Sequence, residues 1–283
     1  MNKKLVFIAD QFAEEYPGGG ELNNQELIML LSERGFEVEK LKTELLTIDF
    51  LKSNKNTPII LGNFLKMQHR DIYLELTSGN YSYAIYEHDH KYLITRDPSH
   101  YPDYKAPSNH IYNQELYQNA KAVFCQSKLH KEVVEKNLGF QNIVNLGGNL
   151  WTKDILDFLL LMSEKKKRNI TSVWNSHNVI KNTNEVIAYC RVKNIPFELV
   201  GGLPHRQFLE QLSNNDTFMF LPKTLETLCR VVVECRVMNI KTITNGKLGA
   251  TSEPWYNLKG KDLYDVLINK RQEIPNKVLE AIL

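Results

Sequence analysis

The sequence predicts an α/β protein with two halves, each built on a parallel sheet that helices cover. Short apolar runs alternate with helical segments over residues 1–150, and the same alternation returns over residues 165–250. This alternation indicates strand–helix–strand units, in which parallel strands are buried on both faces. Gly147-Gly148-Asn149 precedes an amphipathic stretch, which places the boundary near residues 146–165. We therefore expect two Rossmann-like domains, residues 1–150 and residues 151–283.

Apolar runs mark the strands of the first half. The expected strands are Leu5–Ala9, Phe36–Leu41, Thr57–Leu61, Tyr83–Tyr86 and Ala122–Cys125. A glycine-rich loop follows the first strand, and a helix over 21–35 comes next with Gly35 at its C-terminal end. A second helix is expected over 127–137. These elements predict one parallel sheet for residues 1–150.

The second half repeats this order. The expected strands are Ile170–Trp174, Phe197–Val200, Thr217–Leu221 and Lys241–Thr244. Helices are expected between them, over 182–193, 206–212 and 227–238. One or two further helices are expected over 263–283. Two such halves place a cleft between them, where open α/β sheets bind ligands beyond the carboxyl ends of their strands.

Composition indicates a folded protein whose second half is more basic than its first. Hydrophobic residues make up 42% of the 283 residues and charged residues 24%, which excludes a wholly disordered chain. Residues 1–150 carry 16 Lys/Arg and 19 Asp/Glu, a balance of −3, and residues 151–283 carry 19 and 14, a balance of +5. The second half is thus the better host for an anionic ligand, and the first half has no obvious basic face for nucleic acid.

Cysteine usage and hydropathy predict a cytoplasmic protein. The four cysteines form no C-x-x-C pair and lie within apolar runs, as expected for reduced, buried thiols. The first residues are too soon polar for a signal peptide, and no apolar run is long enough for a transmembrane helix.

Two glutamates stand out between the last two strands. Glu226 lies at a loop-to-helix junction and Glu234 follows eight residues later, about 12 Å along a helix axis. One carboxylate would then reach a sugar hydroxyl while the other reaches a ribose diol. The helix start between them would offer backbone N–H groups and a positive dipole end to a diphosphate.

This E-x7-E spacing resembles that of the retaining GT-B glycosyltransferases, especially family four. The resemblance implies that Glu226 binds donor-sugar hydroxyls, that Glu234 binds the ribose, and that the backbone N–H groups of Thr227 and Leu228 face the distal phosphate. The sequence departs from the family in having Cys229 where a glycine is usual.

Three upstream segments extend the resemblance. Lys181 matches the family's phosphate-binding lysine, whereas Ser176 stands at the position of its arginine. The candidate substitutes for this arginine are His177, Arg206 and Arg230. Gly201 and Gly202 resemble the loop beside the nucleotide base. Gly19 and Gly20 resemble the glycine-rich loop near the leaving phosphate, because glycine permits close backbone approach.

A histidine-rich loop follows the fourth strand. In the resemblance His88 contacts the donor sugar, and we take Asp89, His90 and Arg96 as acceptor-side candidates. If this segment is extended, His88 and His90 point the same way. A metal site and a simple polar loop stay open as alternatives, although the resemblance implies catalysis without a metal.

The resemblance implies transfer of a sugar from a nucleotide-sugar donor, UDP- or GDP-linked, to an acceptor hydroxyl with retention of configuration and no cofactor. Glu226, His88 and Lys181 would be the catalytic residues. A glycan or lipid-linked saccharide is the favoured acceptor. The alternatives are transfer to a modified DNA base, a catalytically inactive sugar-nucleotide-binding protein, and an epimerase of related architecture.

Overall fold

The chain forms two compact units in the computed structural model, which describes residues 3–67 and 69–283. Unit 1 comprises residues 1–150 and 271–283, and unit 2 comprises residues 151–270. The sequence had placed residues 271–283 with the second half. Their contacts assign them to unit 1, because they bury apolar side chains in its core.

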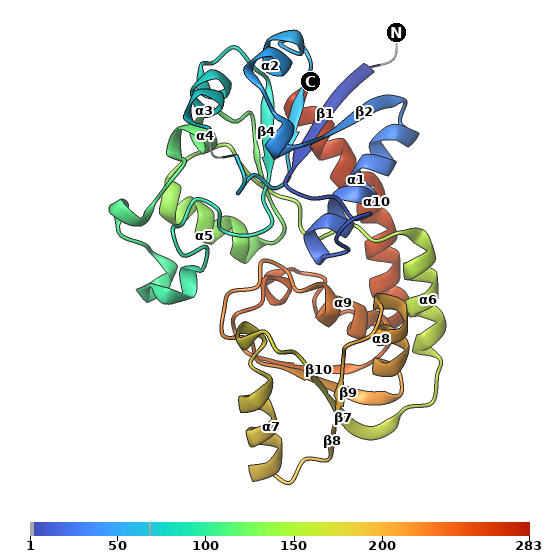
Figure 1. The fold of residues 1–283 in the computed structure, drawn as a ribbon. Coiled ribbons are helices and arrows are strands. Elements are labelled where there is room, and N and C mark those ends of the chain that lie inside the picture. Colours follow the sequence, from blue (N-terminus) through green and yellow to red (C-terminus); the bar gives the residue numbers. More distant parts are fainter. Residues whose placement is uncertain (1–2, 68) are drawn as a thin grey trace. The chain divides into compact units, whose positions relative to one another are not determined.

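Unit 1 is built on six parallel strands in the order β2-β1-β3-β4-β5-β6. The strands are β1 (Lys3–Ala9), β2 (Phe36–Lys42), β3 (Ile59–Leu61), β4 (Tyr83–Tyr86), β5 (Val123–Cys125) and β6 (Ile143–Asn145). The central strands β3, β4 and β5 are buried at every residue, as expected for a sheet covered on both faces (Figure 1).

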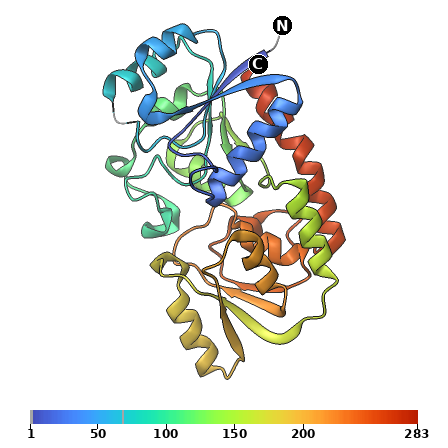
Figure 2. The same cartoon turned by 45° about the vertical axis from the view of Figure 1, so that its right-hand side comes forward.

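Helices cover both faces of this sheet. They are α1 (Gly19–Glu33), α2 (Ile48–Ser53), α3 (Arg70–Thr77), α4 (Gln114–Asn119) and α5 (Lys128–Leu138). Residues 271–282 form the second half of α10 (Gly260–Ile282), and Ile274, Val278 and Ile282 pack into the same core as the α1 leucines. The guanidinium of Arg271 pairs with the buried Glu26 of α1, so this segment runs beside α1 (Figure 2).

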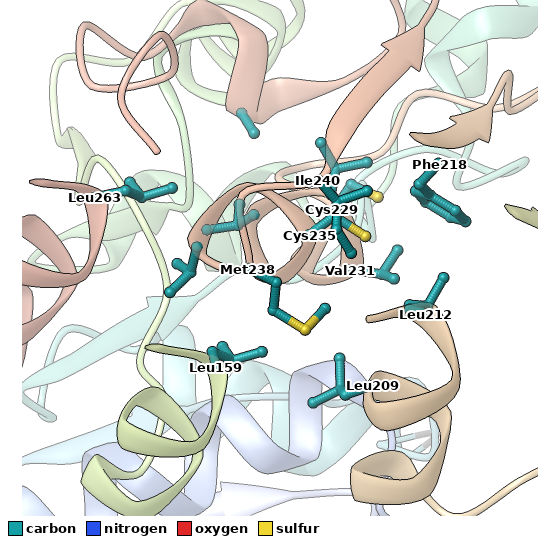
Figure 3. Close-up of a cluster of buried hydrophobic side chains, with 14 of the residues drawn as sticks. Leu159, Leu209, Leu212, Phe218, Cys229, Val231, Cys235, Met238, Ile240 and Leu263 are labelled. Carbon is teal, nitrogen blue, oxygen red and sulfur yellow. The ribbon is translucent and has the colours of Figure 1, made fainter. Parts of the chain in front are cut away.

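Unit 2 has four parallel strands in the order β10-β9-β7-β8. Its elements are α6 (Lys153–Ser163), β7 (Arg168–Trp174), α7 (Thr183–Val192), β8 (Phe197–Val200), α8 (His205–Leu212), β9 (Asn215–Phe220), α9 (Arg230–Val237), β10 (Lys241–Thr244) and the first half of α10. The main core lies between the sheet and helices α6, α8, α9 and α10. In it Met238 lies close to Leu159 of α6 and Leu209 of α8 (Figure 3).

The predicted fold class and most elements are confirmed. The bounds of β4, β8 and β10 agree with the sequence prediction, and most other strands and helices differ from it by one or two residues. The sequence missed β6 and the short helices α2, α3 and α4. All four cysteines are free and buried. Among the described residues, no helix is long and apolar enough to cross a membrane.

Candidate functional site

The strand order of unit 2 marks a candidate ligand-binding position beyond the ends of β7 and β9. The chain leaves β7 toward β8 on one side and returns to β9 on the other, so β7 and β9 flank the point where the connection reverses. Ligands of open α/β sheets bind in the crevice that opens there. Lys181, in the short 3₁₀ turn Val179–Lys181 after β7, and Glu226, in the loop after β9, both lie at this edge.

Lys181 and Glu226 form a close, largely buried ion pair. The Nζ atom of Lys181 lies 2.7 Å from Oε1 of Glu226, and their side chains are only 20% and 18% exposed. The ammonium also lies 5.0 Å from the ring centre of Trp174 and 5.6 Å from that of Phe220. Burial is the largest single effect and would lower the pKa of Lys181, but the charge and hydrogen bond of Glu226, with the nearby Cys229, together raise the pKa above its ordinary value. Lys181 is therefore a fixed cation.

The main chain holds Glu226 in place. Its backbone N–H donates to the carbonyl of Lys247, and its own carbonyl accepts from the N–H of Gly249. These bonds form a parallel bridge between Glu226 and Leu248. A loop residue with both backbone groups paired has little freedom, so its carboxylate is presented in one position.

The helix after Glu226 starts later than the sequence predicted. We expected it at Thr227, but α9 begins at Arg230 with Cys229 as its N-cap. Leu228 is fully buried, and its carbonyl accepts from the N–H of Ala250. The first N–H groups of the helix thus come from Arg230 onward, which corrects the predicted helix start and places Thr227 and Leu228 in the loop before it.

Cys229 adopts a backbone conformation that favours glycine. Its φ is +77° and its ψ is +82°, in the left-handed region that side chains with a Cβ adopt at a cost. The turn therefore keeps a glycine-like geometry although the residue is cysteine. Burial, with the nearby Glu226 charge, raises the pKa of the Cys229 thiol, so the thiol stays protonated and unreactive.

Glu234, on the second turn of α9, is almost fully buried at 2% exposure. Its Oε1 accepts from Nε1 of Trp151 at 2.8 Å and lies 3.1 Å from Nε2 of His205. Burial acts to raise the pKa of Glu234, but the His205 charge and hydrogen bond, with Arg230 and Trp151, bring it below its ordinary value. The same Glu234 charge raises the pKa of His205, against the effect of burial.

Sequence reasoning missed His205. It is the first residue of α8, and its side chain is 34% exposed. Its partner Glu234 is 29 residues away in the sequence, so no local pattern links the two. The one sequence signal for His205 is its position directly after the Gly201-Gly202-Leu203-Pro204 turn.

The two glycines after β8 have distinct geometries. Gly201 has φ +148°, and a Cβ there would lie 2.6 Å from the carbonyl oxygen of Asn175. Gly202 has φ +72° with open space around it. Gly201 thus permits close approach of the loops after β7 and β8, and Gly202 makes the turn. His177 is exposed and lines a pocket of about 450 Å³ to which Lys181, Glu226 and Glu234 do not contribute.

In unit 1 the structure brings the glycine-rich segment to His88. Gly19 and Gly20 are the first residues of α1, and a Cβ on Gly20 would lie 3.3 Å from the His88 ring. The Nε2 of His88 lies 2.5 Å from Oδ1 of Asn24, and its Nδ1 lies 2.7 Å from Nε2 of Gln126. These two contacts hold the His88 ring between α1 and the end of β5.

A buried lysine orders the loop after His88. The Nζ of Lys91 lies 2.5 Å from Glu87 and 2.6 Å from Asp89, with no exposure of the lysine side chain. Burial is the largest single effect and acts to raise the pKa of Asp89, but the charge and hydrogen bond of Lys91, with the Arg96 charge, together bring it below its ordinary value. The other oxygen of Asp89 lies 3.6 Å from Nε of Arg96, which is 47% exposed and has a φ of +53°. Asp89 and Arg96 are therefore brought together at the surface of unit 1.

His90 does not share the position of His88. It is 1% exposed, and its Nδ1 lies 2.9 Å from the hydroxyl of Tyr92. Burial lowers the pKa of His90 to about 4. The loop bends after Glu87 and is not extended, so the condition for a common orientation of His88 and His90 is not met, and His90 is buried. In the described parts of the chain, no three His, Cys, Asp or Glu side chains gather as metal ligands.

Comparison with solved structures identifies the fold. No family model and no curated protein sequence matches the chain. Among solved structures, a glycosyltransferase from Rickettsia africae ESF-5 aligns with a TM-score of 0.59 at 11% identity, over 99% of this chain and 93% of that one. HepE from Anabaena in complex with UDP aligns with a TM-score of 0.55 at 11% identity, over 99% and 92%. The chain has the GT-B fold.

A third neighbour differs in what it binds. An alpha-glucosyltransferase in complex with UDP and a 13-mer DNA containing an HMU base aligns with a TM-score of 0.50 at 10% identity, over 96% of this chain and 90% of that one. GT-B neighbours thus span nearly the whole chain, and both sheets belong to the shared fold.

Proposed function

We propose that this protein is a nucleotide-sugar-dependent glycosyltransferase whose donor binds at the carboxyl ends of β7 and β9 in unit 2. The observation that carries the proposal is the fixed Lys181–Glu226 pair, 2.7 Å apart at the reversal point of the sheet. Neighbours of the same fold were solved with UDP or UDP-glucose, which supports a UDP-linked donor over a GDP-linked one. The positive balance of the second half favours the anionic diphosphate.

The candidate site residues of unit 2 each have a chemical role in this proposal. Lys181 and the first N–H groups of α9 stabilise the negative charge that grows on the departing diphosphate. Glu226 accepts hydrogen bonds from donor-sugar hydroxyls. Glu234, paired with His205, accepts from the ribose, and Gly201 and Gly202 let the chain approach the base. The candidates for the cation that Ser176 does not supply are His177, Arg206 and Arg230.

The proposed reaction retains configuration and needs no metal. The bond from the anomeric carbon to the phosphate oxygen breaks, and a bond to the acceptor oxygen forms on the same face. The acceptor proton passes to the leaving diphosphate. The protein then contributes positioning and electrostatic stabilisation, with His88 of unit 1 contacting the sugar.

A panel of nucleotides tests the donor. We expect UDP or a UDP-sugar to raise the melting temperature more than GDP, ADP or CMP does, because a ligand that binds only the folded state stabilises it. Lys181→Met should remove most of this shift. Lys193→Met, which removes an exposed lysine just after α7, is the matched control and should keep the shift. Equal shifts in both variants would refute the site.

A product assay with the best donor identifies the acceptor. Asp89 and Arg96, exposed together in unit 1, are the proposed acceptor-side groups. We favour a glycan or lipid-linked saccharide as the acceptor, since unit 1 carries a net negative balance. The neighbour solved with DNA supports a modified base as the second candidate. Transfer to duplex DNA, weakened steeply by salt, would establish that candidate. Nucleotide binding without turnover on any acceptor would instead favour an inactive binding protein.

The four buried thiols support a reducing compartment, so we place the protein in the cytoplasm.

A further inference from the structure

A second pocket of unit 2 lies at the opposite edge of its sheet. It has a volume of about 460 Å³ and surrounds the first residues of β9 and β10. Lys181 and Glu226, in contrast, lie beyond the last residues of β7 and β9. The six residues of β9 span about 20 Å, so the two places are well separated. A ligand in this pocket is therefore not the donor at the proposed site.

The lining of this pocket is rich in unpaired positive charge. It includes Arg236 at the end of α9, Lys241 at the start of β10, and Lys259 just before α10. Within the described residues, no carboxylate lies within 4.0 Å of any of the three, although many lysines of this chain do have such partners. The only acidic lining residue is Asp216, whose carboxylate accepts from the hydroxyl of Thr217.

Stacking and two hydrogen bonds hold the Arg236 side chain in one position. Its guanidinium stacks on Tyr256, with 4.5 Å from its central carbon to the ring centre. Nε donates to the carbonyl of Leu258 at 3.2 Å, and Nη1 donates to Oγ1 of Thr242 at 3.4 Å. A guanidinium fixed in this way loses little freedom on binding, and its planar donors match the oxygens of phosphate.

We propose that this pocket is a phosphate-binding site, formed by Arg236, Lys241 and Lys259 and separate from the donor site. Threonine hydroxyls and asparagine amides of the lining supply further donors. Asp216 is the one lining residue among those described whose negative charge would repel an anion. The bound phosphate is either free in solution or part of a lipid headgroup. The inference does not depend on the proposed catalytic function.

Residue-specific protection of lysines tests the site in the intact protein. An amine-acetylating reagent is applied with and without inorganic phosphate at equal ionic strength, and each lysine is quantified by mass spectrometry. We expect Lys241 and Lys259 to react about threefold more slowly when phosphate is at about twice its dissociation constant. Lys166 and Lys193 are the matched controls, because both are exposed on unit 2 and have no carboxylate partner among the described residues. Their rates should not change.

Vesicles separate the two sources of phosphate. The same labelling is repeated with vesicles of phosphatidylcholine alone and of phosphatidylcholine with phosphatidylglycerol. Protection of Lys241 and Lys259 by the anionic vesicles beyond that given by free phosphate assigns the site to a lipid headgroup. Arg236→Lys should reduce the selective protection, because an ammonium cannot keep the fork of donors. The proposal would be overturned if neither phosphate nor anionic vesicles slowed the acetylation of Lys241 and Lys259 more than that of Lys166 and Lys193.

Discussion

Glu234 and His205 form a pair whose charges depend on pH. The raised pKa of His205 means that its contribution to stability is complete below pH 6.5 and is lost as pH rises through the folded-state value. The lowered pKa of Glu234 means that its contribution is present above pH 4.5 and is lost as pH falls. The pair therefore stabilises unit 2 most between these two values.

His205→Gln should flatten this dependence. The native protein should lose more unfolding free energy than the variant does between about pH 6 and about pH 8.5, by up to about 1 kcal/mol. The effect is limited because the His205 side chain is 34% exposed and solvent screens its charge. Urea unfolding at the two pH values measures it. Groups that titrate elsewhere, such as the buried His90, cancel in the comparison. A difference that does not change with pH would show that the pair is not charged.

Cys229 offers a test of backbone strain beside the proposed phosphate position. Cys229→Gly and Cys229→Ala both remove the buried sulfur, but only glycine relieves the left-handed φ of +77°. The glycine variant should be more stable than the alanine variant by about 1 kcal/mol. Thermal or urea unfolding of the two proteins provides the comparison. Equal stabilities would mean that the turn relaxes without cost.

The loop after β8 is the element with the sharpest steric requirement. Gly201→Ala places a Cβ against the Asn175 carbonyl and should destabilise unit 2 by about 1–3 kcal/mol, whereas Gly202→Ala has open space and should cost only about 1 kcal/mol for its positive φ. Chemical unfolding of both variants gives the order. A larger loss at Gly202 would contradict the geometry of the two loops.

The elements that sequence reasoning found are those with strong local signals. Apart from Glu198 and Lys241, the runs 83–86, 197–200 and 241–244 are apolar or β-branched, so the local pattern was sufficient to predict them. Helices α2 and α4 have six residues each, too few for a helical period to stand out. The start of α9 was misjudged because Cys229, a residue without turn preference, carries the turn.

The candidate site was predicted only in part, since its contacts are long-range. Lys181 and Glu226 are 45 residues apart, and their pairing follows from the order of β7 and β9, which no local pattern encodes. His205 was missed for the same reason. His90 was misplaced because the loop after β4 turns around the buried Lys91, whose two carboxylate partners become visible only in the structure.

At the scale of the whole molecule, the core of unit 1 depends on the end of the chain. Ile274→Ala should cost about 2–5 kcal/mol, because it empties a fully buried position. Hydrogen exchange should accelerate in β1 and α1, which share that core, and stay unchanged in β7 and β9. Leu283→Ala, at a side chain 66% exposed, is the control. Acceleration in unit 2 as well would mean that the two units unfold together.

The division of the chain also has a consequence for biosynthesis. A ribosome makes residues 151–270 before residues 271–283, so the polypeptide of unit 2 is complete while that of unit 1 still lacks its last helical segment. Domains ordinarily mature in the order of translation. Here the core of unit 1 lacks Ile274, Val278 and Ile282 until the last residues are translated. We therefore expect the apolar surface that these side chains cover in the folded unit to stay exposed in the nascent chain until then.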